Sequence, residues 1–232
     1  APMNAASKIV SDEKKIAKRL GIGNRVDVVA EKDSFVTLKD RKPNFSNKPT
    51  CRLINPSKSE IGIVSKQILR RINSKIVKAT KINQWNNTDA VIKWFENMPD
   101  KPTRSFICFD IVDFYPSIAK ELLNQALAFA SQYDEITENE RTIIVNANQS
   151  LHFSRNTTWR NKTTNSLFDV PMGSYDGAET CELVGSHLLS QLSADYGNMT
   201  SAYTEVSLLS INHHVKSKTL RNIFARYLKI TN

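Results

Sequence analysis

Residues 105–118 read SFICFDIVDFYPSI, and this stretch decides the fold that the sequence predicts. An apolar run leads directly into Asp110, and a second acid, Asp113, follows three residues later. A short apolar run close to a turn such as Pro116-Ser117 is typical of a buried strand. Asp110 therefore ends that strand, where a carboxylate is costly unless it is paired or binds a metal. A paired structural carboxylate is the simplest alternative, and the neighbouring acid and aromatic residues favour a functional role.

The string FDIVDFYPSI resembles the first catalytic motif of reverse transcriptases from retroelements, retrons and Penelope-like elements. The resemblance implies that Asp110 binds two catalytic Mg²⁺ ions and that the carbonyl of Ile111 completes the coordination of one. It also implies that the backbone around Asp113 and Phe114 faces the incoming deoxynucleoside triphosphate. Tyr115 would be the steric gate that rejects a ribose 2′-hydroxyl. Phosphoryl transfer depends on charge neutralisation, which is why carboxylates and metal ions are expected there.

A second motif, Pro-Met-Gly-Ser, occupies residues 171–174 and precedes a helix predicted from Ala178 onward. It resembles the glycine turn that precedes a palm helix in the same family and lies under the nascent base pair. Only glycine permits such a close backbone approach, so the resemblance implies that Met172 and Gly173 contact the nucleotide. The chain departs from the family in the next residues, because Asp-Gly-Ala-Glu at 176–179 stands where a Ser-Pro pair is usual. The hydrogen bonds to the nucleotide are therefore expected to differ.

The region before the first motif resembles the fingers of these polymerases. Alternation predicts a strand at 34–39, and a second short strand is predicted within 49–56. Apolar residues at steps of three and four from Ile61 to Ile76 then predict an amphipathic helix. The resemblance implies nucleotide-binding roles for Arg52 and Lys66. It implies nucleic-acid-binding roles for four further cations: Lys39, Lys42, Arg70 and Arg71. A solvated basic surface is the alternative for all of them.

Charge is unevenly distributed along the 232 residues, whose formal net charge is +9. Residues 1–82 hold 19 Lys and Arg against 7 Asp and Glu, whereas the remainder holds 13 against 16. A basic half beside an acidic half favours a polyanion-binding enzyme with a metal site. A basic surface without a partner would have the same composition.

Three helices and a polar segment are predicted elsewhere. A helix capped at Asn87 or Thr88 runs to Met98, and its stripe Val91, Trp94, Phe95 and Met98 is predicted to be core. An amphipathic helix follows Ser117. Thr137 and Glu140 form a capping-box pattern that opens a further helix, with His152 on its last turn. Residues 154–165 predict a polar hairpin or loop.

The second half of a polymerase site is missing from the sequence. The family has a hairpin of the form Tyr-x-Asp-Asp after the palm helix, but here Asp195 and Glu205 stand alone. A single Asp leaves two divalent ions poorly coordinated. If the coding sequence from Tyr203 on is read one base earlier, suitable wobble bases would give a string that begins Tyr-Arg-Gly-Leu. This string resembles the Tyr-Arg-Asp-Asp-Gly-Leu hairpin of the family with its Asp pair lost. We therefore hypothesise that the last thirty or so residues are a frameshifted remnant.

The sequence predicts an α+β fragment with right-hand polymerase fingers and a partial palm, in which a small antiparallel sheet packs with several helices. Expected segments are a peripheral region (1–29), fingers (30–104), a partial palm (105–200) and a tail (201–232). The parent enzyme would carry out template-directed deoxynucleotidyl transfer on an RNA or DNA template-primer, whereas this chain is expected to be inactive. The alternatives are a non-catalytic nucleic-acid-binding module and a metal-dependent nuclease that uses Asp110 and Asp113.

The expected location is intracellular, either nuclear or cytoplasmic. No run of 18 apolar residues occurs, and the first residues contain no apolar signal segment. A first residue other than Met predicts a fragment of a longer protein. No protein partner is predicted.

Overall fold

The computed structural model describes residues 15, 17–21, 29–30, 35–41, 43–54, 58–80, 83–84, 88–99, 101–110, 114–148, 152–154, 157–159, 168, 170, 172–196, 200–203 and 206–212. The backbone alone is described at 29–30, 58–60, 83–84, 103–110, 152–154, 157–159, 192, 195–196, 200–203 and 206–212. The chain divides into two compact units. The first unit comprises Ala1–Arg70 and Ile136–Thr180, and the second comprises Arg71–Glu135 and Cys181–Asn232.

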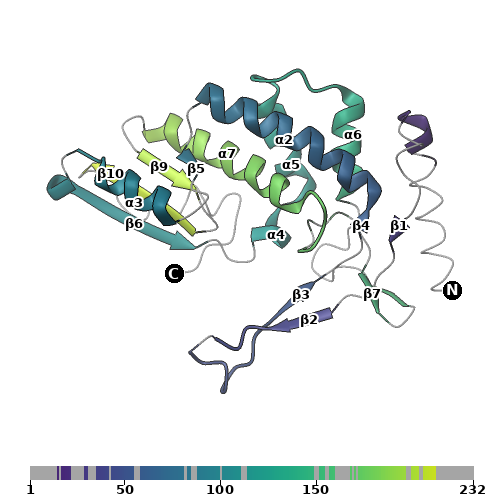
Figure 1. Ribbon diagram of the computed structural model, residues 1–232, viewed down its shortest axis with the longest axis horizontal. Helices are drawn as coiled ribbons and strands as arrows, with labels where there is room; N and C mark the ends of the chain where they lie inside the picture. Colours follow the sequence, from purple (N-terminus) through teal and green to yellow (C-terminus); the bar gives the residue numbers. More distant parts are fainter. Residues whose placement is uncertain are drawn as a thin grey trace. The chain divides into compact units, whose positions relative to one another are not determined.

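Helices and strands are both present, which confirms the predicted α+β class (Figure 1). The largest described sheet belongs to the second unit and has the order β5-β9-β10-β6. Its strands are β5 (Asn83–Gln84), β9 (Thr200–Tyr203), β10 (Val206–Asn212) and β6 (Arg104–Asp110). Strand β10 is antiparallel to both β6 and β9, whereas β5 is parallel to β9. The sheet is therefore mixed, with one parallel pair that the sequence did not predict.

Strand β6 forms where the sequence predicts the organising strand. Its apolar and aromatic residues at 106–109 favour extended backbone, and its last residue is Asp110. The pairing with β10 runs from Val206 opposite Asp110 to Asn212 opposite Arg104. Among the described strands, β6 pairs with β10 alone and so lies at an edge of the sheet.

The core of the first unit forms between helices α2 (Glu60–Thr80) and α6 (Glu138–Ala147). Ile61 and Val64 of α2 pack with Ile143 and Ala147 of α6, and Ala17 joins the same cluster. This confirms the apolar face that residue spacing predicts for α2. Burial of each large aliphatic side chain contributes about 1.5–3 kcal/mol to folding.

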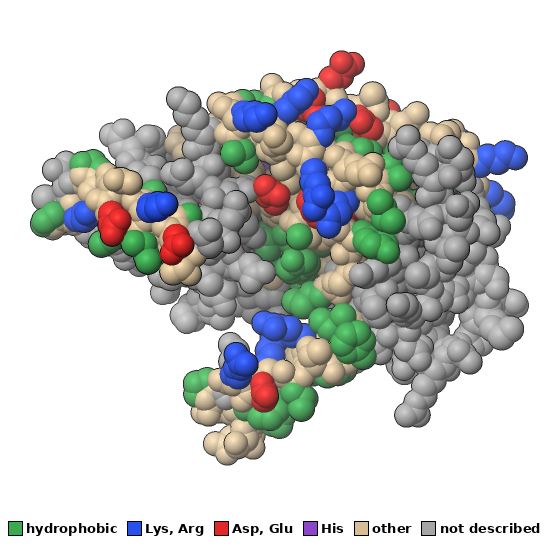
Figure 2. Space-filling model, in the orientation of Figure 1, with side chains coloured by type: hydrophobic (Ala, Val, Ile, Leu, Met, Phe, Trp, Pro, Cys, Tyr) green, Lys and Arg blue, Asp and Glu red, His purple; other side chains and the backbone are tan. Residues whose placement is uncertain are grey.

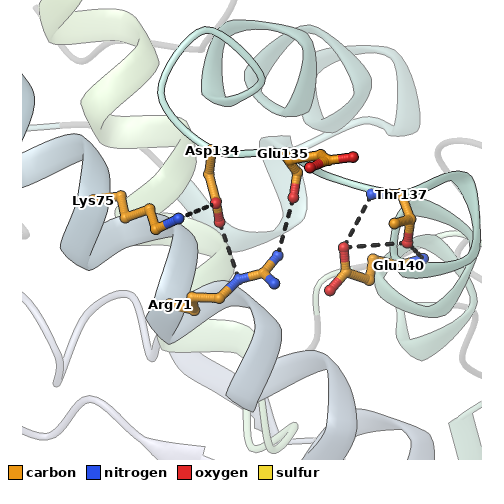
Figure 3. Close-up of polar contacts among 6 residues, drawn as sticks. All are labelled: Arg71, Lys75, Asp134, Glu135, Thr137 and Glu140. Atoms are coloured by element: carbon orange, nitrogen blue, oxygen red, sulfur yellow. Dashed lines mark hydrogen bonds and ion pairs between the residues drawn. The ribbon is translucent and has the colours of Figure 1, made fainter.

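The capping box that opens α6 is confirmed. The backbone N–H of Glu140 donates to Thr137 Oγ1 at 3.2 Å, and the backbone N–H of Thr137 donates to Glu140 Oε2 at 3.0 Å (Figure 3). Two N–H groups that the helix leaves unpaired are thereby satisfied. The helix ends at Ala147, with Asn148 as its C-cap.

The prediction for His152 is wrong, because α6 ends before this residue. His152 instead begins β7 (His152–Ser154), which pairs antiparallel with β8 (Thr157–Trp159). The hairpin predicted for the polar segment therefore exists, but it begins before residue 154. The position of His152 after the apolar stripe of α6 therefore did not indicate where this helix ends.

The second unit contains α3 (Thr88–Glu96), α4 (Phe114–Ser117) and α5 (Lys120–Ala130), and helix α7 (Gly177–Tyr196) ends in this unit. Helix α5 buries its stripe as predicted: Leu122, Leu123, Ala126, Leu127, Phe129 and Ala130. The predicted core stripe is wrong at Phe95, which is 44% exposed, and Val91 and Trp94 are only half-buried. Met98 is buried, but it follows the end of α3. The ring of Phe95 instead lies 5.5 Å from the Lys101 ammonium, a cation–π contact that suits a half-exposed aromatic side chain.

Two short antiparallel pairs complete the description of the first unit. Strand β2 (Phe35–Leu38) pairs with β3 (Cys51–Ile54), which confirms both strands predicted there. Strand β1 (Val29–Ala30) pairs with β4 (Lys58–Ser59). Within the described ranges, none of the helices combines the length and the hydrophobicity that crossing a membrane requires.

Candidate functional site

The structure places the backbone of Asp110 at the end of β6, as the sequence predicts. The Cα of Val206, the first residue of β10, lies opposite the Cα of Asp110 in the ladder. The side chain of Asp110 lies outside the description, and so do Ile111 and Asp113 altogether. The strand end is therefore confirmed, while the ligand roles of these residues stay predictions.

Phe114 and Tyr115 open helix α4 directly after this strand end. Phe114 is buried, with 9% of its surface exposed, whereas Tyr115 is half-buried. Their ring centroids lie 6.5 Å apart at an interplanar angle of 74°, an edge-to-face contact. Such pairs contribute about 0.5–1.5 kcal/mol beyond burial. Phe114 is therefore part of the core, Tyr115 is partly exposed, and the steric-gate role of Tyr115 stays a prediction.

A hairpin that sequence reasoning missed adjoins β6. Strand β9 ends at Tyr203 and β10 begins at Val206, so two residues, Thr204 and Glu205, connect the antiparallel pair. The signal was available, because residues 206–212 read VSLLSIN, a β-prone string. It was set aside because the tail was interpreted as a frameshifted remnant.

The predicted turn at Met172-Gly173 is present in the first unit, ahead of α7. Gly173 has a φ of +107°, a region that residues with a Cβ atom rarely adopt. Gly173 is exposed and Met172 is half-buried. The turn therefore requires glycine for its backbone conformation, independently of any ligand.

Asp176, three residues after Gly173, is fully buried. Its Oδ2 atom accepts hydrogen bonds from Ser65 Oγ of α2 at 2.6 Å and from Asn148 Nδ2 at 3.3 Å. Burial raises the pKa of Asp176 from 3.8 to about 6, and the nearby Glu179 carboxylate adds to this effect, while the hydrogen bonds oppose it. Asp176 thus links α2 and the C-cap of α6 to the segment before α7, although these elements are far apart in sequence.

Two of the cations with predicted binding roles, Lys66 and Arg70, contact an acid, and their binding roles stay predictions. Arg70 Nε donates to Glu179 Oε1 at 2.9 Å, and Lys66 Nζ lies 3.5 Å from the same oxygen. The Glu179 side chain is 9% exposed, whereas Arg70 remains 65% exposed. Lys66 and Arg70 are one helical turn apart on α2, so one buried carboxylate reaches both.

Arg71 is held in the same way within the second unit. Arg71 Nε and Lys75 Nζ lie 3.0 and 2.6 Å from the two carboxylate oxygens of Asp134, whose side chain is 2% exposed. Arg71 Nη2 also donates to the carbonyl of Glu135 at 3.4 Å (Figure 3). Sequence reasoning missed Asp134 and Glu179, because an acid's distant partners cannot be read from local spacing.

Arg52 and Lys39 lie on the β2–β3 hairpin. Arg52 is exposed opposite Thr37 in the ladder, and Lys39, which is half-buried, follows β2. Lys42 lies outside the described residues. The structure therefore brings Lys39 and Arg52 to one hairpin, a pairing that the sequence did not predict, and it does not test what they bind.

No group of three or more His, Cys, Asp and Glu side chains is placed to hold a metal ion in the part of the chain that the structure describes. Because the Asp110 side chain is outside that part, the predicted Mg²⁺ site stays a prediction. No protein-family model matches this chain, and no curated protein sequence matches it either.

Proposed function

We propose that the chain is a degenerate fingers-and-palm fragment of a retroelement reverse transcriptase, an RNA-directed DNA polymerase. The parent enzyme would transfer deoxynucleotides along an RNA or DNA template-primer. The observation that carries the proposal is the end of β6: a strand finishes at Asp110, and four residues later an aromatic pair opens α4. Rigid strand ends are where phosphoryl-transfer enzymes need their carboxylates, because positioning supplies most of the catalysis.

The β9–β10 hairpin adds support, because the family has a hairpin after its palm helix. Here the hairpin follows α7, has Tyr203 at the end of its first strand, and aligns Val206 with Asp110. In the unshifted reading frame, which is the alternative to the frameshift hypothesis, Tyr203-Thr204-Glu205-Val206 would correspond to Tyr-x-Asp-Asp. In that alternative, Glu replaces one acid and Val replaces the other.

This donor set does not suit two Mg²⁺ ions. Asp110 and Glu205 are the acids that the sequence supplies at these positions, and the apolar Val206 begins β10 opposite Asp110. Two-metal transfer needs several oxygen ligands and near-octahedral geometry for each ion. We therefore expect the chain to be inactive, and we assign no catalytic step to it.

The test is primer extension with labelled deoxynucleotide on a primed RNA template with Mg²⁺. The natural chain is expected to incorporate nothing above background. Incorporation that is lost in Asp110→Ala would overturn the proposed inactivity, while supporting the polymerase ancestry.

Non-catalytic nucleic-acid binding is the second candidate, and the β2–β3 hairpin favours it. Arg41, Lys48 and Arg52 are exposed there, beside apolar side chains that are about half exposed, such as Phe35 (Figure 2). Cations next to an exposed aromatic ring suit a phosphate backbone and an unstacked base. The affinity for single-stranded nucleic acid is expected to fall steeply with salt, and more shallowly in Arg52→Gln. Salt-independent binding would exclude this candidate.

A further inference from the structure

A fully buried carboxylate lies within the first unit, and among the described residues no Lys or Arg forms an ion pair with it. Asp176 has no exposed surface, and its Oδ2 atom accepts hydrogen bonds from Ser65 and Asn148, which are both neutral. Its second oxygen, Oδ1, has no hydrogen-bond partner, and the described residues place no Lys or Arg in an ion pair with it. Isolated buried charges are costly, so an ionised Asp176 requires compensation that these contacts do not supply.

Two cations of the first unit pair with another acid. Lys66 and Arg70 both contact Glu179 Oε1, and no described ion pair joins either of them to Asp176. Glu179 also raises the cost of ionising Asp176 because the two acids repel each other. Of these two acids, Glu179 has cationic partners, and Asp176 has none among the described residues.

Asn148, whose amide contacts Asp176, also has a buried oxygen without a partner, and so do Thr180 and Ser174, which are close in sequence. Asn148 is fully buried, and its Nδ2 atom contacts Asp176 Oδ2, so its amide lies against the same carboxylate. Asn148 Oδ1 nevertheless accepts no hydrogen bond, and neither do the Oγ1 atom of the buried Thr180 and the Oγ atom of Ser174. Buried polar atoms are nearly always satisfied in native proteins, so unpaired oxygens beside an unpaired carboxylate indicate a missing ligand.

The chemistry of these oxygens defines the ligand. Carboxylate, amide and hydroxyl oxygens are ligands of hard cations, and no thiolate or imidazole takes part. One carboxylate without a counter-ion balances one positive charge, whereas Ca²⁺ sites in proteins draw on several carboxylates. We propose that Asp176 Oδ1 and Asn148 Oδ1 bind a monovalent cation such as Na⁺ or K⁺.

Such an ion would stabilise the junction of the first unit. Ser65 belongs to α2, Asn148 caps α6, and Asp176 precedes α7 on the segment that carries Gly173. With the cation bound, the ionised carboxylate can hold all three segments near neutral pH. The inference does not depend on the polymerase ancestry, since it concerns stability alone.

The experiment is thermal unfolding of the full chain at pH 7.5 in NaCl, KCl or choline chloride at equal concentration. Equal ionic strength makes general screening the same in all three salts. A bound cation raises Tm by linkage, so Na⁺ or K⁺ should raise Tm above its value in choline by about 3–6 °C for a tenfold excess over Kd. The rise is expected to disappear in Asp176→Asn.

Asp134→Asn is the matched control, because Asp134 is an equally buried acid that already has two cationic partners. This variant should keep the cation-specific rise. Equal Tm values in the three salts, or a rise that persists in Asp176→Asn, would overturn the proposal. If Asp176→Asn does not fold, the natural chain at pH 5 decides. Protons compete with the cation for the carboxylate, so the rise should be clearly smaller at pH 5 than at pH 7.5, and an undiminished rise would overturn the proposal.

Discussion

Ser65 Oγ donates a 2.6 Å hydrogen bond to Asp176 Oδ2, and the two residues are 111 positions apart in the chain. This contact fastens helix α2 to the segment that carries the Met172-Gly173 turn. Both residues are completely buried. The turn is therefore supported by a polar contact whose loss is measurable.

Ser65→Ala is expected to destabilise the protein by about 1–3 kcal/mol, because it removes a donor and leaves a buried carboxylate oxygen less satisfied. Urea unfolding measures the change. Ser74→Ala, at an exposed position of the same helix, is the matched control and should shift stability by less than about 0.5 kcal/mol. Equal effects of the two substitutions would contradict the role of the Ser65 hydroxyl.

Asp176 predicts a pH dependence of stability. The pKa of its carboxyl is raised from 3.8 to about 6 on folding, so the folded state retains a proton that the unfolded state releases between these values. Stability should therefore fall as pH rises from about 4 to about 6, by about 3 kcal/mol in all. Unfolding in choline chloride across this range measures the fall, and Asp176→Asn should flatten it. A slope that is unchanged in that variant would refute the assignment.

Asp134→Ala is expected to cost about 1–3 kcal/mol, since Arg71 and Lys75 would be left close together without their shared carboxylate. The cost is limited because both cations are about half exposed and can be hydrated. Glu135→Ala is the control: its side chain is exposed, and Arg71 contacts its backbone carbonyl. Chemical denaturation of both variants gives the comparison, and a larger loss in Glu135→Ala would be inconsistent with the structure.

Gly173→Ala is expected to destabilise the chain by about 1–3 kcal/mol because an alanine would have to adopt a φ of +107°. The effect arises from backbone strain, since Gly173 is exposed. Ala178→Gly, at an exposed position in the first turn of α7, is a useful comparison with an expected cost near 1 kcal/mol at most. A neutral Gly173→Ala substitution would show that the turn adopts another conformation in solution.

The frameshift hypothesis is tested by the coding DNA. Codons from Tyr203 on, read one base earlier, are expected to give a string that begins Tyr-Arg-Gly-Leu. Codons that exclude this string would refute the hypothesis and leave the β9–β10 hairpin as an original part of the protein.

Local patterns predicted much of the fold. Strands β2, β3 and β6, helices α2, α5 and α6, and the capping box at Thr137 all depend on residues close together in sequence, so spacing was enough to predict them. The turn at Gly173 was predicted because few residues tolerate its backbone conformation. The predicted site residues Asp110, Phe114 and Tyr115 follow each other along the chain, and the structure keeps them at one strand end.

Long-range contacts could not be predicted in this way. The partners of Asp176, Glu179 and Asp134 come from distant elements, and an isolated acid in the sequence does not indicate which cation it binds. Lys66, Arg70 and Arg71 were assigned to ligands because their acidic partners were unknown. The pairing of β10 with β6 could not be predicted either, because it joins residues about a hundred positions apart.

Restoring the lost acids tests the polymerase ancestry most directly. Primer extension on a primed RNA template with Mg²⁺ would compare the natural chain, a Glu205→Asp/Val206→Asp variant, and that variant with Asp110→Ala. The proposal predicts incorporation by the double variant alone, because only this variant supplies three carboxylates at the junction of β6 and β10. A double variant that binds the primed template but incorporates no deoxynucleotide, or incorporation that persists without Asp110, would contradict it.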